Sequence, residues 1–98
     1  MEINKKLSDK TLTVTLKGRL DTNTSGDLEV ALRSDLTKIN KLVLDFKELT
    51  YVSSAGLRVL LATRKFMNKH GDMIIRNVCP AVMEVFQLTG FDEILTIE

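Results

Sequence analysis

Two short segments of the chain place apolar residues at every second position. In residues 11–17, leucine or valine alternates with threonine or lysine, and residues 41–46 have the same spacing. A period of two is typical of a β-strand that buries one face. A parallel sheet covered on both faces would instead have continuous apolar strands. Because Thr13, Thr15 and Asp45 occupy the second face of these segments, the pattern predicts a sheet with helices on one side.

Apolar residues at intervals of three and four predict helices between these strands. We expect strands at residues 2–7, 11–17, 41–46, 72–77 and 94–97, and helices at residues 25–37, 54–69 and 80–89. The first two strands are joined by a turn short enough for an antiparallel hairpin, whereas strand–helix–strand units imply parallel pairing with right-handed crossovers. The predicted fold class is therefore α/β: a two-layer mixed β-sheet with helices mainly on one face, in a single domain over residues 1–98.

The composition argues against several classes of function. With 14 basic and 13 acidic residues the net charge is +1, and there is no tryptophan, so direct binding of nucleic acid is not expected. No apolar run approaches the roughly 18 residues of a membrane span, and the N-terminal segment lacks the apolar centre of a signal peptide. The single cysteine fits a reducing compartment. We expect a cytoplasmic protein that does not insert into membranes.

The residue types needed for self-contained catalysis are missing. The only histidine, His70, follows Ser54 by 16 residues on the same predicted helix, which places it about 24 Å away and too far to act as a base for that serine. One histidine and one cysteine, Cys79, cannot build a zinc site, and no glycine-rich phosphate loop is present. We predict that the chain is not an enzyme and has no metal or cofactor. A small hydrolase using Ser54 is the least favoured alternative.

Two adjacent serines stand at the start of the longest predicted helix. Ser53 is suited to cap that helix, which leaves the hydroxyl of Ser54 free in the first turn. Gly56 costs a helix about 1 kcal/mol relative to alanine, so its position suggests a close approach by another group. One helix face carries Ser54, Arg58, Lys65 and Lys69. An ordinary solvated face explains the lysines, whereas Arg58 lies one turn from Ser54.

The chain resembles the STAS-domain family of bacterial anti-sigma factor antagonists along its whole length. The resemblance rests on Gly18-Arg19-Leu20-Asp21, Leu42-Val43-Leu44-Asp45-Phe46, Ser53-Ser54-Ala55-Gly56-Leu57, Pro80-Ala81-Val82 and Leu88-Thr89-Gly90. The order and spacing of these segments carry the likeness, because each alone is weak. The resemblance implies the STAS-like βα superhelix as the fold.

The resemblance also implies the site. The family pattern is often Asp-Ser-Ser-Gly-Leu or Asp-Ser-Thr-Gly-Leu, and its phosphorylated serine falls on Ser54. Ser53 replaces the family aspartate and is a second candidate for phosphorylation, and Ala55 replaces the hydroxyl residue after the acceptor. Asp21 matches the acidic residue of the loop that engages the partner. The predicted partner-binding residues are Asp21, Thr22, Asn23, Ser53, Ser54, Ala55, Gly56 and Arg58.

The function implied by the resemblance is a switch between partners. The unphosphorylated antagonist binds an anti-sigma factor, which is usually a serine kinase, and thereby frees a sigma factor. Phosphorylation by that kinase reverses the binding, and a serine phosphatase restores it. The second reading is a STAS module without a switch, acting as an adaptor in another complex such as a transporter-associated assembly.

Overall fold

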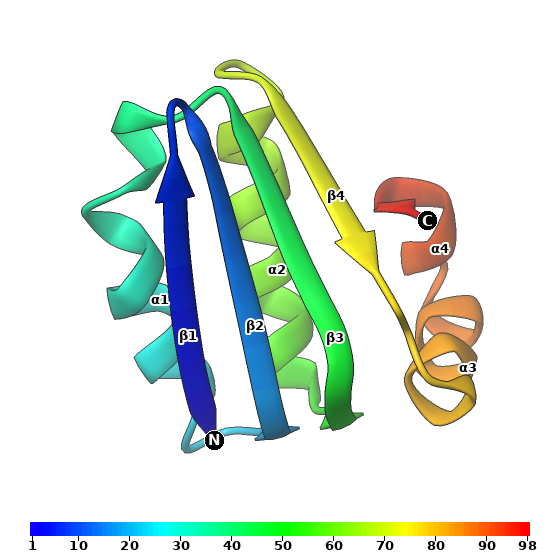
Figure 1. The fold of residues 1–98 in the computed structure, drawn as a ribbon. Helices are drawn as coiled ribbons and strands as arrows, with labels where there is room; N and C mark the ends of the chain where they lie inside the picture. Colours follow the sequence, from blue (N-terminus) through cyan, green and yellow to red (C-terminus); the bar gives the residue numbers. More distant parts are fainter.

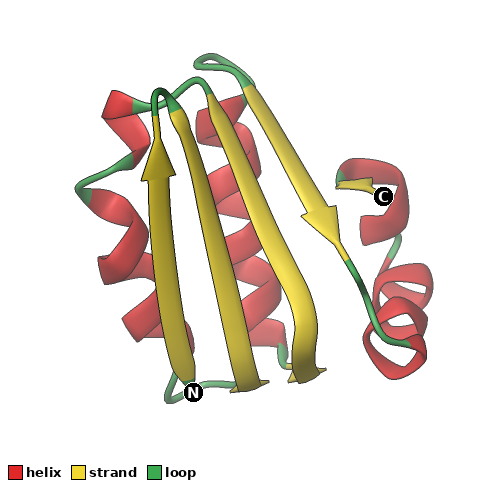
Figure 2. Ribbon diagram, in the orientation of Figure 1, coloured by secondary structure: helices red, strands yellow, loops and turns green.

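A computed structural model describes residues 1–98 as one sheet flanked by helices (Figures 1 and 2). The strands are β1 (Glu2–Ser8), β2 (Thr11–Leu20), β3 (Lys41–Val52), β4 (Asp72–Arg76) and β5 (Thr96–Ile97). The helices are α1 (Ser25–Arg33), the 3₁₀ helix η1 (Leu36–Lys38), α2 (Ser54–Met67), α3 (Pro80–Thr89) and α4 (Phe91–Ile94).

The sheet is mixed and its strands lie in sequence order, β1-β2-β3-β4-β5. The β1–β2 hairpin is antiparallel, and the other three pairings are parallel. Helices α1 and α2 lie side by side on one face, whereas α3 and α4 lie beyond β4 (Figure 1). The expected two-layer mixed sheet is confirmed. The arrangement brings the carboxyl ends of β2 and β3 to the same edge as the start of α2.

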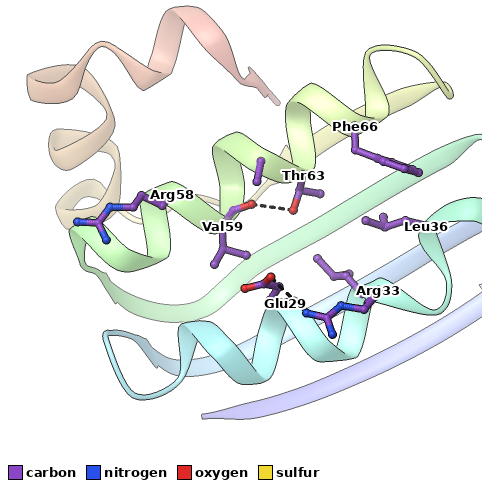
Figure 3. Close-up of a pocket in the computed structure, with 9 residues that line it drawn as sticks. Glu29, Arg33, Leu36, Arg58, Val59, Thr63 and Phe66 are labelled. Atoms are coloured by element: carbon purple, nitrogen blue, oxygen red, sulfur yellow. Dashed lines mark hydrogen bonds and ion pairs between the residues drawn. The ribbon is translucent and has the colours of Figure 1, made fainter.

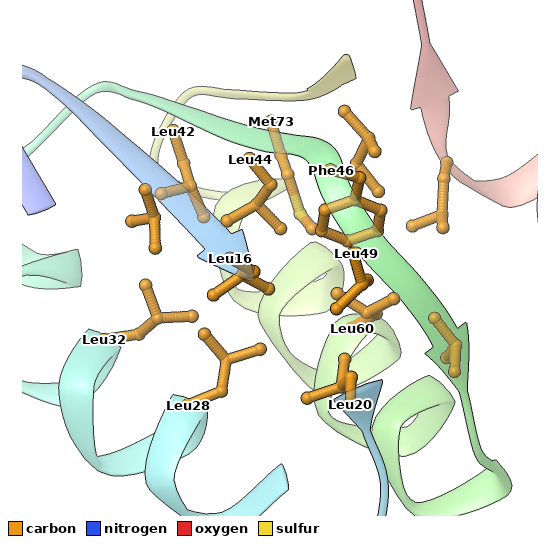
Figure 4. Close-up of a cluster of buried hydrophobic side chains, with 14 of the residues drawn as sticks. Leu16, Leu20, Leu28, Leu32, Leu42, Leu44, Phe46, Leu49, Leu60 and Met73 are labelled. Atoms are coloured by element: carbon orange, nitrogen blue, oxygen red, sulfur yellow. The ribbon is translucent and has the colours of Figure 1, made fainter. Parts of the chain in front are cut away.

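The core lies between the sheet and the helices (Figure 4). The alternating leucines and valine of β2 are at most 1% exposed, because they face α1 and α2. Helix α3 joins the same core, since the rings of Phe46 and Phe86 lie 6.4 Å apart. The outer face carries half-buried Thr13, Thr15 and Asp45, as the alternation predicts.

Strand β3 is longer than the sequence pattern predicts, ending at Val52 and not at Phe46. Its register against β2 shifts twice, once between Thr15 and Lys17 and once between Gly18 and Arg19. Each shift places an additional β3 residue opposite β2, which is the geometry of a β-bulge. The buried residues of this half therefore recur every third position, at 46, 49 and 52, and the period of two is lost.

Several predicted boundaries are also wrong. Helix α1 ends at Arg33 and not at residue 37. Near this end, Lys5 of β1 donates to the carbonyl of Ala31 and to the carboxylate of Asp35, both at 2.9 Å. Helix α2 ends at Met67, and β2 continues to Leu20. Residue 94, expected in the last strand, belongs to α4, which begins directly after α3. Strand β4 ends at residue 76, one position earlier than predicted.

Candidate functional site

The loop between β2 and α1 is held by reciprocal hydrogen bonds between Asp21 and Thr24. The carboxylate of Asp21 accepts from the backbone N–H groups of Asn23 and Thr24, both at 3.0 Å. The hydroxyl oxygen of Thr24 accepts from the N–H of Asp21 at 2.8 Å and donates to the carbonyl of Arg19 at 2.7 Å. The carboxylate of Asp21 thus forms a local turn before α1, and the side chain of Thr24, the N-cap of that helix, makes no capping bond to it. These hydrogen bonds link Asp21 and Thr24 of the loop to the end of β2.

The same bonds favour the charged form of Asp21. The N–H of Thr24, its hydroxyl, the N–H of Asn23 and the nearby Arg19 guanidinium together hold the pKa of this carboxyl below its usual value, against a smaller opposing effect of partial burial. The loop therefore carries a fixed negative charge at neutral pH.

The two serines at the start of α2 have different surroundings. Ser53 is the N-cap: its side chain accepts from the N–H of Gly56 at 3.2 Å, and its carbonyl accepts from the N–H of Leu57 at 2.9 Å. Ser54 is the first residue of the helix and is exposed, and no hydrogen bond holds its hydroxyl. The capping role inferred for Ser53 and the free hydroxyl inferred for Ser54 are thus both found.

Leu20 joins the loop to the start of α2. Its carbonyl accepts from the N–H of Ser53 at 2.8 Å. Its side chain fills the space beside Gly56, where an added Cβ would stand 2.8 Å from Leu20 Cγ and 3.0 Å from Leu20 O. The close approach suggested by the sequence is therefore an internal contact. Gly56 is buried and offers little surface to a partner. Its lack of a side chain instead allows α2 to pack closely against Leu20 of β2.

The other predicted partner-binding residues lie around this contact. Thr22 and Asn23 are exposed on the loop, and Ala55 is half-buried in the first turn of α2. Arg58 is exposed one turn after Ser54, and it forms no ion pair. The predicted set, apart from Gly56, therefore offers surface at the edge where β2 and β3 end.

The fold and this site can be compared with known proteins. The family model described as the STAS domain matches residues 2–98, which is nearly the whole chain. The chain belongs to the STAS domain family. Members of this family that antagonise anti-sigma factors are binding proteins and not enzymes.

Two relatives align with most of this STAS domain. BtrV of Bordetella bronchiseptica is 34% identical over 91 residues, covering 91% of this chain and 78% of BtrV. An anti-sigma F factor antagonist of Paenibacillus polymyxa is 32% identical over 89 residues, covering 88% of this chain and 76% of that protein.

Two solved structures support the fold of the STAS domain. The anti-sigma factor antagonist SpoIIAA in its unphosphorylated form has a TM-score of 0.85 at 19% identity, covering 99% of this chain and 88% of that one. Phosphorylated SpoIIAA of Bacillus has a TM-score of 0.78 at 18% identity, covering 99% and 91% of the two chains. At these identities the likeness is one of fold.

The STAS domain has further residues at this edge that the sequence pattern does not reveal. The guanidinium of Arg19 lies over the ring of Tyr51, 4.1 Å from its centroid, where β2 and β3 pair. Such cation–π contacts are favourable, and Tyr and Arg are common anchors of protein interfaces. Their pairing depends on the shifted register of β3, which no local pattern predicts. In the sequence, only the spacing of three residues between Asp21 and Thr24 indicates the hydrogen bonds that these two residues form.

Away from this edge, His70 and Cys79 make contacts within the domain. His70 stacks on Phe66 with ring centroids 3.9 Å apart, and its Nδ1 lies 2.8 Å from the carbonyl of Phe66. Cys79 is half-buried and its thiol donates to the carbonyl of Leu49 at 3.4 Å. No three His, Cys, Asp or Glu side chains lie close enough together to hold a metal ion. None of the helices combines the length and apolar character required to cross a lipid bilayer.

Proposed function

We propose that this chain is a cytoplasmic anti-sigma factor antagonist controlled by phosphorylation of Ser54. The unphosphorylated form binds an anti-sigma factor that is also a serine kinase, and a sigma factor is released. Phosphorylation of Ser54 ends the binding, and a serine phosphatase restores it. The observation that carries the proposal is the exposed hydroxyl of Ser54 at the start of α2 in a STAS domain.

The surroundings favour Ser54 over Ser53 as the acceptor. Phosphorylation of Ser53 would disturb the bond that its side chain forms with the N–H of Gly56, and loss of an N-cap costs about 1 kcal/mol. The hydroxyl of Ser54 has no such bond, so a kinase meets no competing interaction there. Ser53 is therefore the secondary candidate.

The start of α2 can accept an added phosphate. Phosphorylation adds about 1.5 to 2 negative charges, and free N–H groups and the positive end of the helix dipole favour an anion at this end. The first turn of α2 holds no acidic residue, and Arg58 stands one turn away without an ion-pair partner. A charge-assisted hydrogen bond from Arg58 would further stabilise the phosphoserine. The modified domain should keep its backbone conformation.

The loss of binding then comes from the contact surface. Loop residues 21–23 and the first turn of α2 form one edge, because Leu20 bonds to Ser53 and packs on Gly56. A phosphate introduced into a close contact at this edge must lose water and meet any anionic group that the partner presents there. Two steps of 1.4 kcal/mol correspond to a hundredfold loss of affinity, which is enough for a switch.

The test is the affinity of four forms of the chain for its cognate anti-sigma factor kinase: wild type, Ser54→Ala, Ser54→Asp and the phosphoprotein. We expect Ser54→Ala to bind within a few-fold of wild type and the phosphoprotein to bind at least about a hundredfold more weakly. Ser54→Asp should lie between them, because a carboxylate carries less charge than a phosphate. Equal affinity of all four forms would contradict the proposal.

A control separates the switch from a fixed adaptor. Incubation with the kinase and ATP, followed by mass spectrometry, should add one phosphate to wild type and to Ser53→Ala, and none to Ser54→Ala. The replacement of the family aspartate by Ser53 keeps the adaptor as the second candidate. An adaptor would gain no phosphate in any of the three proteins and would still bind its partner.

A further inference from the structure

A groove separates α1 from α2 on the side of the helices that faces away from the sheet. Its volume is about 400 Å³ (Figure 3). Leu32, Leu36, Val59, Ala62 and Phe66 form its apolar part. Small-molecule sites commonly have volumes of about 300 to 1,000 Å³ and mostly apolar linings, so the groove has the dimensions of a ligand site.

The floor of the groove presents no free polar group. Thr63 is the polar residue among the floor side chains, and its hydroxyl donates to the carbonyl of Val59 at 2.7 Å within the helix. Leu32, which lines the groove from α1, is 1% exposed, whereas Ala62, which lines it from α2, is exposed. A hydrocarbon chain would therefore meet no unsatisfied donor or acceptor along the floor.

The two ends of the groove differ in charge: one carries arginine and the other is apolar. Arg58 stands at the end nearest Ser54 and has no ion-pair partner, whereas Arg33 on the opposite wall pairs with Glu29 at 3.3 Å (Figure 3). The far end is formed by Leu36 and Phe66 (Figure 3). Helix α2 contains no acidic residue that would neutralise Arg58. The groove thus combines one available cation at one end with an apolar floor and an apolar far end.

We propose that this groove binds a single-chain amphiphile with an anionic head, such as a medium-chain carboxylate. The head contacts the guanidinium of Arg58, and the chain lies over Val59 and Ala62 toward Phe66. A charged, hydrogen-bonding head suits an unpaired guanidinium, and a chain without polar groups suits a floor that offers none. The head would use the same guanidinium that we propose to contact phosphorylated Ser54, so the two anions would compete for Arg58, but binding to the unphosphorylated chain does not require the switch at Ser54.

The experiment is a titration of the ¹⁵N-labelled chain with octanoate and decanoate below their critical micelle concentrations, followed by ¹H–¹⁵N NMR spectra. We expect saturable shift changes confined to α1, η1 and α2. Each buried methylene contributes up to about a fourfold gain in affinity, so decanoate should bind about 4- to 15-fold more tightly than octanoate. 1-Octanol and octylammonium, which have the same chain length as octanoate, should bind at least about tenfold more weakly.

Three variants locate the ligand. Ala62→Gln adds bulk to the groove at an exposed position, and glutamine is a good helix former. This variant should bind decanoate at least tenfold more weakly. Arg58→Gln should remove the preference for octanoate over 1-octanol. Lys69→Gln is the matched control, because it removes an exposed cation just beyond α2 that does not line the groove. The absence of saturable shifts, affinity unchanged by Ala62→Gln, or equal affinity for octanoate and 1-octanol in wild type would each overturn the proposal.

Discussion

The contact between Gly56 and Leu20 can be tested with a pair of glycine-to-alanine substitutions. Gly56 lies in the first turn of α2, and an added Cβ would stand 2.8 Å from Leu20 Cγ and 3.0 Å from Leu20 O, closer than the 3.4 Å at which ordinary contact begins. Gly26 lies in the first turn of α1, and an added Cβ there would meet no atom within 4 Å. The two positions therefore share a backbone conformation and differ in the space around them.

The magnitudes follow from two opposing effects. Alanine is favoured over glycine in a helix by up to about 1 kcal/mol, and this gain applies at both positions. Overpacking a buried contact costs about 1 to 3 kcal/mol, and this cost applies only at Gly56, where one contacted atom belongs to the backbone. We expect Gly26→Ala to stabilise the chain by up to about 1 kcal/mol and Gly56→Ala to destabilise it by about 1 kcal/mol. The difference between the variants, about 2 kcal/mol, measures the steric cost.

Urea unfolding followed by circular dichroism gives both free energies of unfolding. A change of 1 kcal/mol corresponds to a shift of about 4 to 8 °C in Tm for a domain of this size, so thermal unfolding provides a second measurement. The slope of free energy against urea should be unchanged, because neither substitution alters the surface exposed on unfolding. If Gly56→Ala is at least as stable as Gly26→Ala, Leu20 does not constrain the start of α2 and our account of this glycine is wrong.

Three further results are expected from stability measurements. Ser53→Ala should cost about 1 kcal/mol, checked by urea unfolding, because it removes the cap bond to the N–H of Gly56. Asp21→Asn should lower Tm at pH 7; since the folded pKa of Asp21 is lowered, this difference should persist above about pH 4 and vanish as the pH falls further, checked by Tm against pH. Phe46→Ala should cost about 3 to 5 kcal/mol in urea unfolding, because Phe46 is fully buried against Phe86.

Local periodicity predicts much of this fold. The alternation of β2 and the helical spacing of α1, α2 and α3 reflect contacts with the same core, so the strand–helix order follows from the residues alone. The second half of β3 was missed because two bulges replace the period of two by a spacing of three. The sequence pattern does not predict the end of α1, where the Ala31 carbonyl accepts from Lys5, a residue 26 positions earlier in the chain.

The candidate site is predictable to a similar extent. The division of roles between Ser53 and Ser54 follows from capping preferences within one turn. The pairing of Arg19 with Tyr51 and the filling of space at Gly56 by Leu20 depend on contacts between β2, β3 and α2, which a linear pattern does not contain. The groove is likewise absent from the sequence pattern, because its walls come from two helices.

The position of β1 at the margin of the sheet bears on the solubility of the chain. Beyond β1 no strand follows, so its outward N–H and C=O groups are open to pairing with a strand of another molecule, which is a route to aggregation. Lys5 and Lys6 are adjacent in this strand and therefore project on opposite faces, and every position of β1 but one is exposed. Lys5 is paired with Asp35, whereas Lys6 has no ion-pair partner. The charge of Lys6 would have to be desolvated if a second molecule extended the sheet, so Lys6 acts as a gatekeeper against self-association.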